Sequence, residues 1–149
     1  MFLRALFAFL VLPGIVAFAV PIAWLFRNTH TELQYPAGLP ILLVGCVGLL
    51  WCVRDFYVLG KGTLAPWSPP QHLVTSGLYR YSRNPMYVSV LLILLGWTLT
   101  FGALRGLGGY TAIVAVAFYV RVVLFEEPWL ARTHGAMWDD YVRRVRRWV

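Results

Sequence analysis

The sequence predicts an all-α integral membrane protein with about four transmembrane helices and a C-terminal amphipathic helical segment, in one domain covering residues 1–149. Composition is the first reason: hydrophobic residues make up 60% of the chain, charged residues only 13%, and mean hydropathy is +0.68. Soluble domains contain about 45–50% hydrophobic residues and about 25% charged residues. Four long apolar runs and the basic residues beside them are the other reasons. Lipid is therefore the expected solvent for most of the chain.

The four apolar runs are the expected spans, because a helix needs about 20 residues to cross the hydrocarbon core. They cover roughly 5–26, 37–59, 85–104 and 110–125. Pro13 and Pro21 predict kinks in the first run. Residues 17–19 (Ala-Phe-Ala) also resemble a signal-peptide cleavage site. The apolar stretch continues to Phe26, however, beyond the length of an ordinary signal core, which favours a span.

The distribution of basic residues predicts the orientation. Arg27 and Arg105 fall on one side of a four-span arrangement. The other side carries the larger group, which consists of Arg4, Lys61, Arg80, Arg83, Arg132, Arg143, Arg144, Arg146 and Arg147. Cytoplasmic loops carry the excess of Lys and Arg in multi-pass membrane proteins. Both termini and the loop 60–84 are therefore expected in the cytoplasm.

Two other classes of partner are excluded by the same survey. The net charge of +7 could indicate nucleic-acid binding, but the basic residues flank apolar runs and no nucleic-acid-binding motif is present. Anionic headgroups explain them more simply. Cys46 and Cys52 are about 9 Å apart along a helix, beyond disulfide reach. Without a matching His cluster they also make a poor metal site, so no metal is expected.

The two polar segments are expected to be ordered. Loop 60–84 contains three prolines that stiffen it, and Trp67 and Tyr79 suit a membrane interface. In the C-terminal segment 126–149, apolar residues recur at three- and four-residue spacing. This stripe consists of Trp138, Tyr141, Val142, Val145 and Trp148. The pattern is typical of a helix in the headgroup plane, and the stripe can bury against lipid, against the cytoplasmic ends of the spans, or against both.

Two clusters of polar and aromatic residues carry the candidate chemistry, and the four-span topology brings both to the cytoplasmic face. The first covers residues 71–87, and the second begins with the adjacent Glu126 and Glu127. Adjacent carboxylates at a membrane boundary are costly unless they are solvated or paired. Two structural readings remain open: the glutamates could cap a helix break before Pro128, and the arginines of the first cluster could contact headgroups.

The spacing within both clusters resembles a known family. The matching patterns are Thr75-x-Gly77-x-Tyr79, Arg83-Asn84-Pro85-x-Tyr87, Glu126-Glu127-x-x-Leu130, and Gly135 followed six residues later by Tyr141. They are similar to the isoprenylcysteine carboxyl methyltransferase family, and the related phospholipid N-methyltransferases share much of the pattern. The resemblance covers roughly residues 71–145, about half of the chain, and the first two spans carry no comparable signature.

The resemblance implies S-adenosylmethionine as the methyl donor and a membrane lipid or lipidated molecule as the acceptor. The cofactor-binding residues that it implies are Gln71, His72, Leu73, Val74, Tyr79, Asn84, Pro85, Met86, Tyr87 and Glu126. Arg121 and Glu127 are the candidate substrate-binding residues. A carboxylate such as Glu126 is the natural partner for an ammonium group. No residue is assigned as a catalyst, because methyl transfer from a sulfonium mainly needs alignment and exclusion of water.

Three departures from the family pattern affect this interpretation. Asn84 stands where the family usually has His, and an amide cannot titrate, which excludes proton transfer there. Gln71 also replaces a frequent His. The family places a substrate-contacting Arg four residues before the first glutamate, whereas Arg121 is five before Glu126. On an α-helix that puts Arg121 about 140° from the expected face, so a structural ion pair fits it equally well.

The leading functional prediction is carboxyl O-methylation by a membrane enzyme related to the isoprenylcysteine carboxyl methyltransferases. The alternative within enzymes is N-methylation of a phospholipid amine. A third reading is a non-catalytic membrane subunit that keeps the fold, which the departures at Asn84 and Gln71 leave open.

Overall fold

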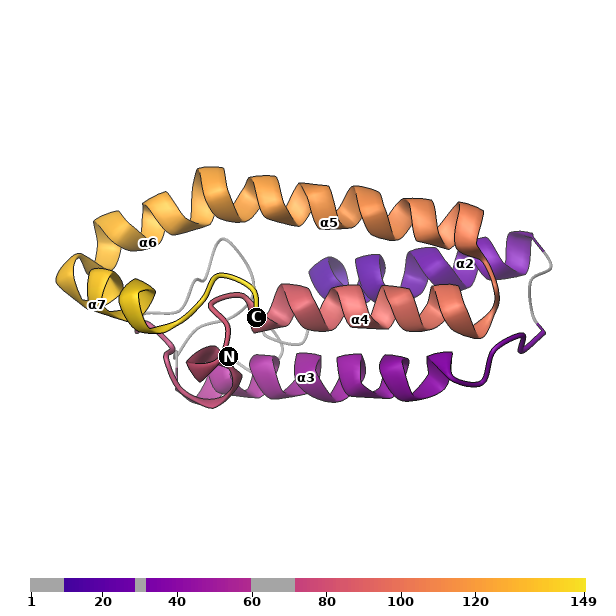
Figure 1. Ribbon diagram of the computed structural model, residues 1–149, viewed down its shortest axis with the longest axis horizontal. Helices are drawn as coiled ribbons and strands as arrows, with labels where there is room; N and C mark the ends of the chain where they lie inside the picture. Colours follow the sequence, from indigo (N-terminus) through magenta and orange to yellow (C-terminus); the bar gives the residue numbers. More distant parts are fainter. Residues whose placement is uncertain (1–9, 29–31, 60–71) are drawn as a thin grey trace.

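The computed structural model describes residues 10–28, 32–59 and 72–149, and every regular element in these ranges is helical. The one backbone bridge of β type in them joins Ser82 and Arg146 in parallel. Figure 1 shows the long helices lying side by side along the longest axis of the molecule, with the short helix α7 at one end. The all-α prediction is therefore confirmed.

The first helical segment begins as a π-helix, η1 (Leu10–Ala19), and continues as α2 (Val20–Arg27). Pro13 lies inside η1 and Pro21 lies just after the η1–α2 junction of the continuous helix, where its missing N–H leaves the preceding turn without a helical donor. Two side chains of later helices hold this segment. The indole N–H of Trp97 donates to the carbonyl of Ala17 at 3.0 Å, and the Tyr110 hydroxyl donates to the carbonyl of Val16 at 3.1 Å.

Helices α3 (Gly38–Val58) and α4 (Pro85–Thr100) form an antiparallel pair that positions the candidate site. Their backbones approach closely because glycine lies at the contact. A Cβ atom on Gly45 would lie 2.7 Å from the backbone nitrogen of Ile93, so no larger residue fits without moving a helix. Small residues allow the same close approach in other membrane helix pairs. The pair's buried side chains, with those of neighbouring helices, form a core of Ala17, Leu49, Val90, Ile93, Leu94 and Val114.

The second half of the chain contains one continuous helical rod. It is built from η3 (Leu104–Gly108), α5 (Gly109–Arg121), η4 (Val122–Glu126) and α6 (Glu127–His134), and η3 and η4 are π-helical. Figure 1 shows α5 and α6 as a single arc above the other helices. The rod ends at Gly135, whose φ of +49° suits glycine, and α7 (Ala136–Arg144) then turns back toward the bundle.

Two helices are long and apolar enough to cross a membrane: Gly38–Val58 and Leu104–His134, each with a mean hydropathy of 1.8. Pro13–Arg27 and Pro85–Thr100 are apolar but shorter. The described residues thus contain two candidate spans by length and composition, and the arrangement of four spans stays a prediction. The outer surfaces of α3 and α5 expose large apolar side chains, such as Leu43 at 63% and Ile113 at 70%, which is the pattern of a surface that contacts lipid.

The apolar stripe of the C-terminal segment packs against protein. Trp138, Tyr141 and Val145 are buried, and partly buried apolar side chains cover them, namely Leu73, Leu130, Ala131 and Val142. Among the alternatives that the sequence leaves open, the structure thus places this part of the stripe on the ends of the helices. Beyond α7 the chain runs back so that the C-terminus lies beside the start of α4 (Figure 1).

Candidate functional site

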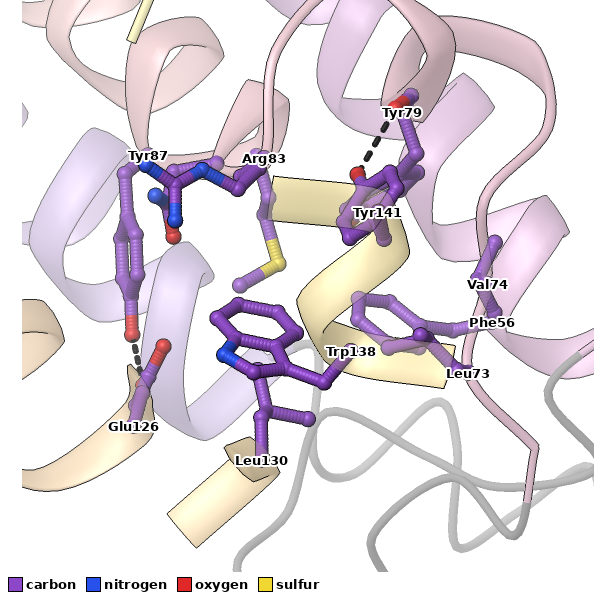
Figure 2. Close-up of a pocket in the computed structure, with 12 residues that line it drawn as sticks. Phe56, Leu73, Val74, Tyr79, Arg83, Tyr87, Glu126, Leu130, Trp138 and Tyr141 are labelled. Carbon is purple, nitrogen blue, oxygen red and sulfur yellow. Dashed lines mark hydrogen bonds between the residues drawn. The ribbon is translucent and has the colours of Figure 1, made fainter. Parts of the chain in front are cut away.

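A cavity lies where the start of α4, the η4–α6 junction, α7 and the end of α3 meet (Figure 2). Its lining residues are Phe56, Leu73, Val74, Tyr79, Arg83, Asn84, Met86, Tyr87, Glu126, Leu130, Trp138 and Tyr141. The cavity has a volume of about 90 Å³. Ligand pockets are typically about 300–1,000 Å³. A cofactor-sized molecule would therefore have to extend beyond this cavity.

Glu126 is the anionic group of this cavity, and two side chains fix its position. The hydroxyl of Tyr87 donates to Glu126 Oε1, as Figure 2 shows, and Arg121 Nε donates to the same oxygen at 2.7 Å. Arg121 Nε also lies 3.1 Å from the Tyr87 hydroxyl. Both contacts use Oε1, so among the described residues Oε2 forms no hydrogen bond. One carboxylate oxygen thus stays available for a ligand.

The α-helical spacing placed Arg121 about 140° from the face expected for a substrate-contacting arginine and left a structural ion pair open, and the structure shows such a pair with Glu126. Arg121 immediately precedes the π-helix η4 and Glu126 is the last residue of η4, and their side chains form an ion pair. A π-helix bonds residue i to residue i+5, so residues five apart come to lie on the same side of the helix. The wider π-helical turn therefore compensates for the extra residue between Arg121 and Glu126. As a result, the Arg121 side chain reaches the edge of the cavity.

Glu127 turns away from the cavity and binds two arginines. Arg147 contacts it with two parallel hydrogen bonds, Nε to Oε1 at 2.9 Å and Nη2 to Oε2 at 2.8 Å. Arg83 Nη1 lies 3.0 Å from Oε1. The Glu127 side chain is only 16% exposed, so these cations offset the cost of burying its charge. Hydrogen bonding to Glu127 raises the pKa of the Arg147 guanidinium.

The segment after α7 is also held by main-chain contacts to the residues before α4. The Arg83 N–H donates to the Arg146 carbonyl at 2.9 Å, and Asn84 Nδ2 donates to the Arg147 carbonyl at 3.0 Å. The Ser82 hydroxyl lies 3.4 Å from the same carbonyl. Asn84 thus uses its amide as a donor to the backbone, a contact that needs no titratable group.

Tyr79 and Tyr141 form the opposite side of the cavity. Gly77, with φ of +61°, begins the 3₁₀-helix η2 (Gly77–Arg80), which turns the Tyr79 ring inward. Tyr141 donates its hydroxyl to the Tyr79 carbonyl at 2.7 Å (Figure 2). Burial raises the pKa of the Tyr79 hydroxyl well above its ordinary value and that of Tyr141 to about 12, although the charge of Arg83 lowers the latter. Both hydroxyls therefore stay protonated near neutral pH.

A family of known proteins matches more than half of this chain. Residues 33–137 match the family described as phospholipid methyltransferase, a range that includes both clusters found in the sequence. The chain belongs to this family. The sequence-based prediction of a related family is confirmed.

One curated relative is the cobalt-zinc-cadmium resistance protein CzcN of Cupriavidus metallidurans, which is 36% identical over 118 residues. The matched region is 77% of this chain and 48% of the relative, so this chain spans about half the length of that protein. No solved structure matches.

Most of the predicted cofactor-binding residues lie together. Leu73, Val74, Tyr79, Asn84, Met86, Tyr87 and Glu126 all line the cavity. His72 is exposed and Pro85 begins α4, and neither lines it. Gln71 lies outside the described residues. Of the two predicted substrate-binding residues, Arg121 forms an ion pair with Glu126. The other, Glu127, forms ion pairs with Arg83 and Arg147.

Sequence reasoning missed several residues that line the cavity: Phe56, Arg83, Leu130, Trp138 and Tyr141. Arg83 and Leu130 belong to the matching patterns, but no role was assigned to them. The resemblance at Gly135 and Tyr141 implies a C-terminal segment that packs over the cofactor, and Trp138 belongs to the apolar stripe of that segment. Phe56 comes from α3, and no motif in that helix marks it.

Proposed function

We propose that this chain is an S-adenosylmethionine-dependent methyltransferase whose acceptor is a membrane-embedded amphiphile with a carboxylate group. The observation that carries this proposal is the Arg121–Glu126–Tyr87 contact at the edge of the cavity. It puts a fixed anion and a fixed cation side by side, at the boundary between the cavity and the outer surface of the helical rod. Membership of the phospholipid methyltransferase family supports the reaction type.

The residues of the cavity fit the cofactor's chemistry. Glu126 Oε2 is an acceptor for the ammonium group, and a partly buried carboxylate attracts a cation more strongly than an exposed one. The aromatic and aliphatic side chains of Phe56, Val74 and Trp138 suit the adenine ring. When bound, the cofactor would supply a methyl group activated by its sulfonium.

The acceptor class follows from the position of Arg121. Its side chain is 54% exposed, and it lines a shallow depression on the outer surface of the rod with Ala117, Val120 and Phe125. A carboxylate acceptor needs a cation to hold it, whereas an ammonium headgroup would be repelled by one. An amphiphile could keep its chain in lipid along α5 and bring its carboxylate to Arg121.

The chain's own contribution is alignment and exclusion of water. A carboxylate nucleophile is already ionised and needs no general base, which agrees with an amide at Asn84. Trp138 and Tyr141 of α7 cover the cavity, and the contacts of Arg147 hold the segment after α7 in place. Holding donor and acceptor together in a dry site can supply a large part of the rate enhancement.

The test begins with the protein purified in detergent and calorimetry with S-adenosylmethionine and S-adenosylhomocysteine. Transfer of a radiolabelled methyl group is then measured into a prenylated cysteine carboxylate and into phosphatidylethanolamine. We expect labelling of the carboxylate, and we expect Arg121→Ala to raise the KM for this acceptor more than it weakens S-adenosylhomocysteine, because Tyr87 still holds Glu126.

The other outcomes are also informative. Preferential labelling of the amine, the reaction that the family description favours, would overturn the carboxylate assignment. Absence of cofactor binding would support a non-catalytic subunit that keeps the fold.

A further inference from the structure

Arg83 has an unsatisfied polar atom at the cavity. Its Nε is buried and, in the part of the chain that the structure describes, donates to no acceptor. The side chain as a whole is 11% exposed, and its guanidinium carbon lies 5.8 Å from the centre of the Trp138 ring. Buried polar groups are nearly always hydrogen-bonded, and an exception next to a cavity calls for an explanation.

The contacts of Arg83 show which part of the guanidinium is unused. Nη1 is paired with Glu127 Oε1 at 3.0 Å. The buried Nε donates to no described acceptor, and the edge formed by Nε and Nη2 presents two parallel N–H groups that match a carboxylate. Arg147 uses this edge of its own guanidinium, because its Nε and Nη2 bind both oxygens of Glu127. Glu127 meets Arg83 through Nη1 and leaves its Nε without an acceptor.

We propose that Arg83 binds the carboxylate at the amino-acid end of the cofactor through its Nε–Nη2 edge. This inference rests on the proposed function, which supplies the cofactor. Among the residues that line the cavity, Arg83 is the cationic one and Glu126 the anionic one. The amino-acid end of S-adenosylmethionine carries an ammonium and a carboxylate on one carbon, so the pair of opposite charges on the protein matches the pair on the ligand.

The contacts of Arg83 also explain why it is held so firmly. Its backbone N–H is bound to Arg146, one Nη atom is bound to Glu127, and its guanidinium lies over Trp138. A planar cation fixed in this way loses little additional freedom when it binds a ligand. Lysine at this position would keep the charge without the two parallel donors.

The experiment compares two ligands in two proteins. Calorimetry measures the affinity for S-adenosylmethionine and for decarboxylated S-adenosylmethionine, which keeps the sulfonium and the ammonium but has hydrogen in place of the carboxylate. In the parent protein we expect the decarboxylated ligand to bind roughly 10–150-fold more weakly, the range for loss of a charge-assisted hydrogen bond. In Arg83→Gln the ratio of the two affinities should fall close to one.

Controls separate binding from a general effect on folding. Arg80 is exposed, lies three residues earlier in η2 and is not part of the cavity, so Arg80→Gln should keep the parent's ratio. Arg83→Lys retains a charge for Glu127 and should still reduce the ratio several-fold; it provides the answer if Arg83→Gln does not fold, which a melting curve reveals.

Two results would overturn the inference. Arg83→Gln and Arg83→Lys could keep the parent's ratio, or they could weaken both ligands equally, which would show that Arg83 only supports the fold. Failure of the proposed function is distinguishable from both, because the parent protein itself would then bind neither ligand.

Discussion

The ion pair between Arg147 and Glu127 should fasten the segment after α7 to the start of α6 and thereby support its contacts with the residues before α4, and Arg147→Ala tests this. Buried charge-assisted hydrogen bonds contribute about 1.5–3 kcal/mol, and exposed ion pairs about 0.2–1 kcal/mol. Arg147 is 34% exposed and Glu127 is 16% exposed, so this pair lies between the limits. Arg83 keeps Glu127 paired when Arg147 is removed. We therefore expect a loss of about 1–2 kcal/mol, or roughly 5–30-fold more frequent opening of the segment.

Hydrogen exchange provides a local readout of that opening, because the amide of Arg83 is bound to the Arg146 carbonyl. In Arg147→Ala this amide should exchange roughly 5–30-fold faster, while amides in the middle of α3 and α4 keep their parent rates. The matched control is Arg146→Ala: the Arg146 side chain is exposed, and only its carbonyl takes part in the contact. Equal protection of Arg83 in both variants would refute the reasoning.

Three further predictions concern the cofactor, the alkaline stability and the topology. Glu126→Ala should weaken S-adenosylhomocysteine roughly 10–150-fold in calorimetry without lowering the melting temperature; damage from Glu127→Ala instead would mean that the two glutamates have been assigned the wrong way round. Because burial raises the pKa of Tyr141 from 10.0 to about 12, the folded protein retains a proton that the unfolded chain loses. The stabilisation that this pKa shift contributes should be complete below about pH 10 and should be lost as the pH rises toward about 12. In melting scans, Tyr141→Phe should therefore lose less melting temperature over this pH range than the parent protein does. With the native cysteines removed, Ser76→Cys should react with a membrane-impermeant thiol reagent from the cytoplasmic side, and labelling from the side of Arg27 would reverse the proposed orientation.

The helices could be predicted from the sequence where hydrophobicity sets their ends. The expected span 37–59 corresponds to α3 at Gly38–Val58, and α4 begins at Pro85, as a proline in the first turn requires. The length of the last long helix was underestimated, because the apolar run ends near Phe125 whereas the helix continues to His134. A change from apolar to polar residues does not end a helix. Gly135, with its positive φ, does.

The candidate site was predictable to the extent that it comes from contiguous motifs. Residues before and within the start of α4 lie together because one turn and one helix carry them, and Glu126 was assigned from the family resemblance, with which its charge agrees. Phe56 could not be found this way, since it reaches the cavity only through the packing of α3. The π-helical turn that brings Arg121 to Glu126 could not be found either, because spacing along an ideal α-helix does not reveal such a turn.

Adjacent glutamates at a membrane boundary raise the question of how two such charges are tolerated, and the structure answers it with two separate sets of cations. Successive residues on a helix point about 100° apart, so Glu126 faces Arg121 and Tyr87, whereas Glu127 faces Arg83 and Arg147. Arg121 occupies only Oε1 of Glu126. On the proposed function, the ammonium of the cofactor can therefore bind Oε2 without displacing Arg121, and Arg121 stays free to hold the acceptor's carboxylate. One glutamate would then bring the methyl donor and the acceptor to the same point, while its neighbour holds the segment that covers them.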